Sequence, residues 1–206
     1  MSTYEIYTKF ITDFQFLSWQ EWVSTFTQIA SVWYARKNNI LVYPTGIVGV
    51  LLAAWLYLFI SAPPLYADGI LNIYYFFMSV YGWYNWTRMA GNQELVYKIN
   101  WCSKNELFAG IAGFIGAWIA LYLMLYILTD SNTPILDALV SSSAVTAMWW
   151  MAKRKIENWL AWIFSNIIAI PLNFYKGFML FTLMYILFLV MAYWGYRAWK
   201  IKLSET

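Results

Sequence analysis

Long apolar runs alternate with short stretches of charged residues, proline or glycine along most of the chain. A helix needs about 20 mostly apolar residues to cross the hydrocarbon core of a membrane. The pattern therefore predicts seven spans, at residues 17–35, 44–62, 66–86, 107–128, 133–151, 156–171 and 175–194. Pro63 and Pro64 close the second span, and Pro171 lies in the break before the last one. Gln20 and Glu21 make the first span the most polar of the set.

Composition favours a membrane protein over a soluble one. Hydrophobic residues make up 62% of the chain and charged residues 11%, against about 25% charged in soluble domains. Residues 1–206 are expected to form a single membrane domain without a cleavable signal, because no basic region is followed by an apolar one at the N-terminus. Cys102 is the only cysteine and histidine is absent, so we expect no disulfide, no metal site and no cofactor.

The basic residues sort to one side of the predicted spans. Seven spans leave only Lys9 and Lys176 on one side. The other side holds the remaining 11 of the 13 basic residues: Arg36, Lys37, Arg88, Lys98, Lys104, Lys153, Arg154, Lys155, Arg197, Lys200 and Lys202. Cytoplasmic loops carry an excess of lysine and arginine. We therefore expect the C-terminus in the cytoplasm and the N-terminus outside.

An internal repeat is visible in the sequence. Residues 33–39 (WYARKNN) resemble residues 150–155 (WMAKRK), with Trp33 opposite Trp150. Three further matches are Tyr66 with Tyr175, Gly82 with Gly195 and Trp86 with Trp199.

The repeat predicts an all-α membrane fold of two three-helix bundles. Residues 17–86 form the first bundle, residues 133–199 the second, and residues 107–128 a linker helix between them. A single linker span gives both bundles the same orientation, so they are parallel repeats in a 3+1+3 arrangement.

Polar and aromatic residues recur at three- and four-residue steps in the spans of both bundles, as on one face of a helix. Polar groups inside a membrane are costly unless they are paired or functional. We expect a water-filled, substrate-binding cavity lined by Asn72, Tyr75, Ser79, Trp83, Trp86, Asn158, Trp159, Trp162, Asn166, Tyr175, Thr182 and Tyr185. Two alternatives stay open: an amide such as Asn166 also serves as a bond between helices, and end tryptophans also serve as interfacial anchors.

This lining suits a planar solute that is neutral or cationic, since rings stack on tryptophan and tyrosine and cations favour their faces. No lysine or arginine lies deep in a predicted span, whereas phosphorylated solutes normally need fixed positive charge. A nucleoside therefore fits better than a nucleotide. The candidate carboxylate for ion coupling, Asp137, lies near the outer end of its span, which favours an uncoupled facilitator. No catalytic triad or phosphate loop is present, so we expect no enzyme activity.

Several short motifs resemble those of the PnuC-type vitamin transporters. They are residues 43–46 (YPTG), 65–68 (LYAD), 81–86 (YGWYNW), 157–162 (ENWLAW), 175–177 (YKG) and 195–199 (GYRAW). The resemblance implies a SWEET-like 3+1+3 fold and a homotrimer in the bacterial inner membrane. It also implies facilitated diffusion of nicotinamide riboside, which cytoplasmic phosphorylation then traps. Relatives carry thiamine or riboflavin, and the motifs do not exclude these solutes. The expected partners are the solute, the lipid bilayer and further copies of the chain, with no nucleic acid.

Overall fold

The computed structural model describes residues 3–61, 65–90, 94–129 and 131–205. This part of the chain contains helices and no β-strand beyond two isolated bridges. The elements are α1 (Thr3–Gln15), α2 (Trp19–Arg36), α3 (Val42–Trp55), η1 (Leu56–Ile60), α4 (Tyr66–Thr87), α5 (Lys104–Leu128), α6 (Pro134–Ala152), α7 (Glu157–Lys176) and α8 (Met179–Ser204). The predicted all-α fold is confirmed for the described residues.

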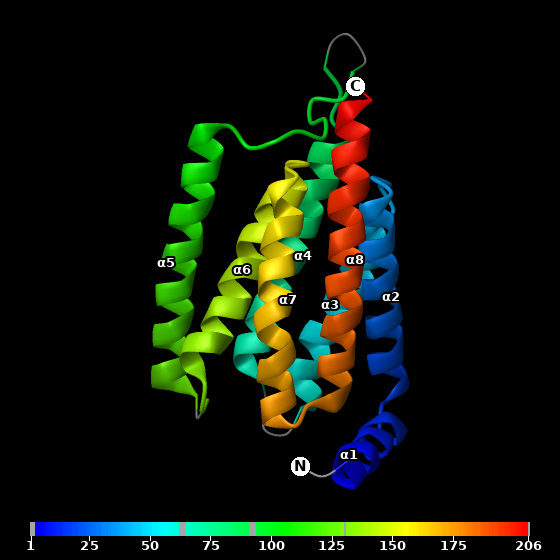
Figure 1. Ribbon diagram of the computed structural model, residues 1–206, viewed down its shortest axis with the longest axis vertical. Helices are drawn as coiled ribbons and strands as arrows, with labels where there is room; N and C mark the ends of the chain where they lie inside the picture. Colours follow the sequence, from blue (N-terminus) through cyan, green and yellow to red (C-terminus); the bar gives the residue numbers. More distant parts are fainter. Residues whose placement is uncertain (1–2, 62–64, 91–93, 130, 206) are drawn as a thin grey trace.

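Within the described residues, four stretches are long and apolar enough to cross a membrane: Val42–Ile60, Lys104–Leu128, Pro134–Ala152 and Met179–Ser204. They correspond to the second, fourth, fifth and seventh predicted spans. Helices α2, α4 and α7 occupy the positions of the other three and run alongside these four (Figure 1). The molecule is a helical membrane protein, and the full count of seven spans stays a prediction.

Six helices pack in a closed ring. Going round it, α2 packs against α3, α3 against α4, α4 against α6, α6 against α7, α7 against α8, and α8 against α2. Helix α5 packs against α6 at the side of the bundle (Figure 1). The C-terminus lies at one end of the bundle and α1 at the other (Figure 1), and we call these the C-terminal end and the N-terminal end. The ring has two seams between its halves, α4–α6 and α2–α8.

Several boundaries differ from the prediction. Helix α1 was not expected, and it packs against α8. Helix α7 continues through Pro171 to Lys176, because one missing N–H is tolerated where the neighbouring helical bonds persist. The helix ends instead at Gly177, whose φ of 77° is the left-handed conformation that stops helices. Tyr175 therefore lies in the last turn of α7 and not at the start of the final span. Pro63 and Pro64 lie outside the described residues.

The α2–α3 and α6–α7 loops have matching backbones. Asn38 and Arg154 both have a φ of 54°. The Asn38 N–H donates to the Ala35 carbonyl and the Arg154 N–H to the Met151 carbonyl, each over 2.9 Å. These bonds place Ala35 opposite Met151. The sequence match of Trp33 with Trp150 is therefore displaced by one residue from the correspondence in the structure.

Candidate functional site

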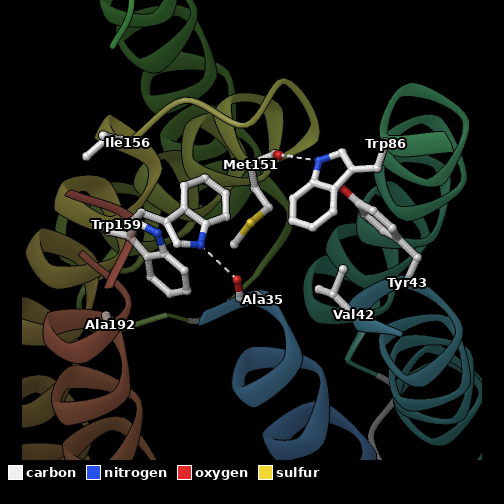
Figure 2. Close-up of a cluster of buried hydrophobic side chains, with 9 residues drawn as sticks. Ala35, Val42, Tyr43, Trp86, Met151, Ile156, Trp159 and Ala192 are labelled. Atoms are coloured by element: carbon white, nitrogen blue, oxygen red, sulfur yellow. Dashed lines mark hydrogen bonds between the residues drawn. The ribbon is translucent and has the colours of Figure 1, made fainter. Parts of the chain in front are cut away.

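Aromatic side chains fill the ring at its C-terminal end. This aromatic plug consists of Ala35, Val42, Tyr43, Trp86, Met151, Ile156, Trp159, Ala192 and Trp199, all buried (Figure 2). The rings of Tyr43 and Trp86 meet edge to face at 5.1 Å, and those of Trp159 and Trp199 do so at 5.5 Å. Such a packed cluster leaves no passage through this end of the ring in the present conformation.

Glycines allow these rings to sit between the helices. A Cβ atom at Gly82 of α4 would collide with the ring of Tyr43 on α3. A Cβ atom at Gly195 of α8 would collide with the ring of Trp159 on α7, with its nearest ring atom at 2.6 Å. Both glycines therefore serve a close approach between neighbouring helices.

Two indoles bond across the seams of the ring. Trp86 on α4 donates its Nε1–H to the carbonyl of Met151 on α6 over 3.1 Å. Trp199 on α8 donates in the same way to the carbonyl of Ala35 on α2 over 2.9 Å (Figure 2). Each half of the ring thus holds the loop of the other half, which stabilises the closed end.

The basic triplet at residues 153–155 is largely buried rather than solvated. Arg154 is 4% exposed and Lys155 is 6% exposed. The Arg154 guanidinium lies 4.3 Å from the centroid of Trp86 and donates to the Tyr97 carbonyl over 2.5 Å. Lys155 forms a 2.8 Å ion pair with Glu106. Burial lowers the pKa of Arg154 from its ordinary value, while the π face of Trp86 and the carbonyl of Tyr97 stabilise its charge.

The segment before α5 is hydrogen-bonded to the α6–α7 loop and to the start of α7. The Asn100 N–H donates to the Arg154 carbonyl over 3.2 Å, and the Ile156 N–H donates to the Asn100 carbonyl over 3.0 Å. The Cys102 N–H donates to Glu157 Oε1 over 2.8 Å. Burial, together with the charge and hydrogen bond of Glu157, raises the pKa of the Cys102 thiol to about 12. These bonds hold residues 100–102 against the α6–α7 loop at the closed end.

At the N-terminal end three tyrosines lie near a carboxylate. Tyr57 on η1 and Tyr185 on α8 are close enough to Asp68 on α4 to interact with its charge, and so is Tyr75. The three tyrosines are partly buried and Asp68 is exposed. We call this group of four residues the vestibule. It combines aromatic faces, hydroxyl groups and a carboxylate, which is a suitable lining for a cationic ring.

An ion pair lies beside the vestibule. Lys176 at the end of α7 contacts Asp137 on α6 with 2.5 Å between Nζ and Oδ1. Asp137 also accepts hydrogen bonds from Ser131 and Thr133, over 2.6 and 3.1 Å. Both members of the pair interact electrostatically with Asp68. Because Lys176 balances one of the two carboxylates, the group carries a net negative charge.

Two buried polar side chains lie between the vestibule and the plug along their helices. Asn166 on α7 and Ser79 on α4 are 2% and 4% exposed. Neither side chain has a hydrogen-bond partner among the described residues. The fully buried side-chain atoms that lack a hydrogen-bond partner among the described residues belong to other residues, including Tyr43, Asn158 and Trp159 at the closed end. Asn166 and Ser79 are candidate contacts for a polar solute because of their depth and their amide and hydroxyl groups.

The twelve predicted site residues separate by depth. Trp86, Trp159 and Asn158 lie at the closed end, and Trp162 packs against the plug. Asn158 donates to the Lys155 carbonyl. Asn72 and Thr182 bond to backbone carbonyls of their own helices. Tyr75 and Tyr185 meet in the vestibule, and Ser79 and Asn166 lie between.

Two of the twelve do not face the interior. Trp83 is 40% exposed and Tyr175 is 77% exposed, so their expected location in the cavity is corrected. Gly82, Asn85 and Trp86 of α4 are buried whereas Trp83 is not, and Tyr175 belongs to the exposed last turn of α7.

Sequence reasoning missed Tyr57 and Asp68. Asp68 precedes Asn72, Tyr75 and Ser79 at the same three- and four-residue steps, so the periodicity of α4 contained the signal. Tyr57 had none, because it lies in a π turn closed by the Ser61 N–H and the Leu56 carbonyl at 2.8 Å. Such turns are rare in proteins as a whole, and those that occur are often found at functional sites.

Comparisons with known proteins identify the family of the chain. The family model described as "Nicotinamide mononucleotide transporter" matches residues 18–201. The chain is 27% identical over 207 residues to the nicotinamide riboside transporter PnuC of Escherichia coli (strain K12), covering 89% of this chain and 85% of that protein. It is 26% identical over 129 residues to the riboflavin/roseoflavin transporter RibM of Streptomyces davaonensis, covering 61% of this chain and 60% of that one.

A solved structure shares the fold. The crystal structure of the vitamin B3 transporter PnuC superposes with a TM-score of 0.70 at 24% identity, covering 95% of this chain and 86% of that chain. The likeness therefore includes the helices that form the ring.

Proposed function

This chain belongs to the nicotinamide mononucleotide transporter family, whose members here are membrane transporters and not enzymes, and from that premise we propose that it carries nicotinamide riboside into the cytoplasm. The E. coli relative is named for that solute. The solute joins a cationic pyridinium ring to an uncharged ribose, so it offers one aromatic cation and several hydroxyl groups.

The observation that carries the proposal is the chemistry of the vestibule. Tyr57, Tyr75 and Tyr185 offer aromatic faces and hydroxyl groups around the carboxylate of Asp68. A cationic ring gains from both, through cation–π attraction and through the negative charge. The side-chain amide of Asn166 can hydrogen-bond a ribose hydroxyl deeper in the ring.

The riboside fits this interior better than its phosphate would. Among the described residues, the lysine beside the vestibule, Lys176, is already paired with Asp137. Arg154 and Lys155 are engaged at the closed end by Trp86 and Glu106. Lys9 lies against Gly177 at the same end of the bundle, but a phosphate in the vestibule would still be repelled by the carboxylate of Asp68.

The proposed topology has seven spans in two parallel repeats. Residues 17–86 and 133–199 form the repeats and residues 107–128 the linker, in a 3+1+3 arrangement. The matching loops and the paired indole bonds support this division. With the C-terminus in the cytoplasm and the N-terminus outside, the vestibule faces outward and the plug faces the cytoplasm.

Transport then follows as alternating access. The solute enters the vestibule, reaches Asn166 and Ser79, and leaves when the two halves rock and the plug separates. Asp68 and Asp137 lie near the outer end and not at mid-depth, which favours uniport over ion coupling. Phosphorylation in the cytoplasm traps the product, and the assembly is a homotrimer in the inner membrane.

Flux into liposomes containing the purified protein tests the proposal. Labelled nicotinamide riboside should enter until the inner and outer concentrations are equal, with or without a proton or sodium gradient. Asn166→Leu, which removes the amide at mid-depth, should slow entry. Accumulation above the external concentration without a trapping enzyme would disprove uniport.

Riboflavin is the second candidate solute, because RibM is among the similar proteins. The same liposomes should be offered labelled riboflavin and thiamine in parallel. Entry of either one in place of the riboside would overturn the assignment while leaving the transport class intact.

A further inference from the structure

An apolar groove follows the seam between α2 and α8. Its walls come from Phe26, Ala30 and Trp33 on α2 and from Leu187, Met191 and Trp194 on α8, and its cavity measures about 430 Å³. Trp33 and Trp194 are 40% and 47% exposed, whereas Met191 is 3% exposed. The small side chain of Ala30 and the buried Met191 thus form a floor between the two tryptophan side chains.

The groove has a cationic end. Arg36 lies 4.6 Å from the ring of Trp33 and 5.4 Å from the ring of Trp194, so its guanidinium bridges the two walls. The ammonium of Lys37 lies 5.0 Å from the ring of Trp33. Neither cation forms an ion pair with a carboxylate of a described residue. Two unpaired positive charges therefore lie at the mouth of an apolar groove.

We propose that an anionic phospholipid occupies this groove, with its phosphate on Arg36 and Lys37 and an acyl chain between α2 and α8. Tryptophans gather at the level of the lipid headgroups, and basic residues lie just beyond them. Basic residues near the membrane surface attract anionic headgroups. An apolar molecule would leave both cations unsatisfied, and a zwitterionic lipid would bring a repelling ammonium group.

The opposite seam does not offer the same site. There the hydroxyl of Tyr74 on α4 donates to the Val145 carbonyl on α6 over 3.0 Å and bridges the two helices. Lys153 lies 4.3 Å from the ring of Trp149 on α6 and Arg88 lies 5.8 Å from the ring of Tyr84 on α4, but neither cation bridges rings of both helices as Arg36 does. The lipid would therefore bind at the α2–α8 seam and not at the α4–α6 seam.

Binding of defined lipids to the purified full-length chain in detergent tests this site. Native mass spectrometry would compare phosphatidylglycerol with phosphatidylcholine of identical acyl chains. We expect at least tenfold tighter binding of phosphatidylglycerol. The double variant Arg36→Gln/Lys37→Gln should lose that preference, and Ala30→Trp, which fills the floor and keeps both cations, should weaken phosphatidylglycerol binding about tenfold. Lys153→Gln is the matched control and should change binding less than twofold.

The outcomes separate the alternatives. Equal binding of both lipids, or an unchanged preference in Arg36→Gln/Lys37→Gln, would overturn the headgroup assignment. Unchanged binding in Ala30→Trp would overturn the acyl groove and indicate attraction to surface charge alone. Displacement of the lipid by inorganic phosphate at equal concentration would also overturn the proposal. Leu187→Trp blocks the same groove from α8 and replaces Ala30→Trp if that variant does not fold, judged by its unfolding temperature.

Discussion

The indole N–H of Trp199 donates to the carbonyl oxygen of Ala35 over 2.9 Å, although 164 positions separate the two residues in the chain. Trp199 is 0% exposed and Ala35 is 1% exposed, so neither group has water as an alternative partner. The bond joins the last helix to the first helix of the ring. It closes the ring at the end where the aromatic plug lies.

Trp199→Phe should destabilise the protein by about 1 kcal/mol, because it removes a buried hydrogen bond between α8 and α2, while the Ala35 carbonyl keeps its bond from the Asn38 N–H. A lower unfolding temperature in detergent would measure the loss. Trp83→Phe is the matched control, since Trp83 is 40% exposed and its indole has no bond to another described residue. Equal effects of the two substitutions would contradict the role given to the Trp199 bond.

Tyr75→Ala and Tyr185→Ala should each weaken nicotinamide riboside binding about tenfold, which corresponds to about 1.4 kcal/mol. Each removes an aromatic face from the vestibule, where the two residues lie close together. Calorimetric titration of the purified protein measures the change. Tyr175→Ala removes the same kind of side chain at a position that is 77% exposed, and it should bind as the native chain does.

Asp68→Asn should reduce the affinity for the cationic riboside a few-fold and make that affinity less sensitive to salt, because it removes the negative charge that attracts the ring. The neutral dihydro form of the riboside should be affected less. Binding isotherms at two ionic strengths provide the measurement. An equal loss for both forms would show that Asp68 acts through shape and not through charge.

Arg154→Met should lower stability by about 1–3 kcal/mol, since it removes the guanidinium from the face of Trp86 and leaves the Tyr97 carbonyl without its donor. Unfolding in detergent measures this difference. Lys98→Met is the control: its ion pair with Glu94 has side chains 56% and 57% exposed, so its loss should cost less than about 1 kcal/mol.

Cys102 should react slowly with thiol reagents at pH 8. Its labelling rate should rise about tenfold for each pH unit until the pH reaches the thiol pKa of about 12. The thiolate is the reactive form, and a raised pKa leaves less of it at a given pH. Glu157→Gln removes the negative charge that disfavours the thiolate, so the pKa should fall and labelling at pH 8 should accelerate. A labelling rate that is independent of Glu157 would contradict the assigned cause.

The sequence by itself determined the class of the molecule. The lengths of the apolar runs predicted the four most hydrophobic helices, since a membrane crossing requires a nearly fixed number of apolar residues. The spacing of Gly82 and Trp86, echoed by Gly195 and Trp199, identified positions that pack alike in the structure. Local chemistry sufficed in these cases, because the signal lies within one helix.

The tertiary structure decided which polar and aromatic residues share a space. Tyr57 and Asp68 join Tyr75 and Tyr185 only because η1, α4 and α8 meet at one end of the ring. Arg154 is buried, contrary to what a basic run suggests, because Trp86 and Tyr97 reach it from distant segments. Helical periodicity states which residues share a face, but the helix that each face meets follows from packing across the whole chain.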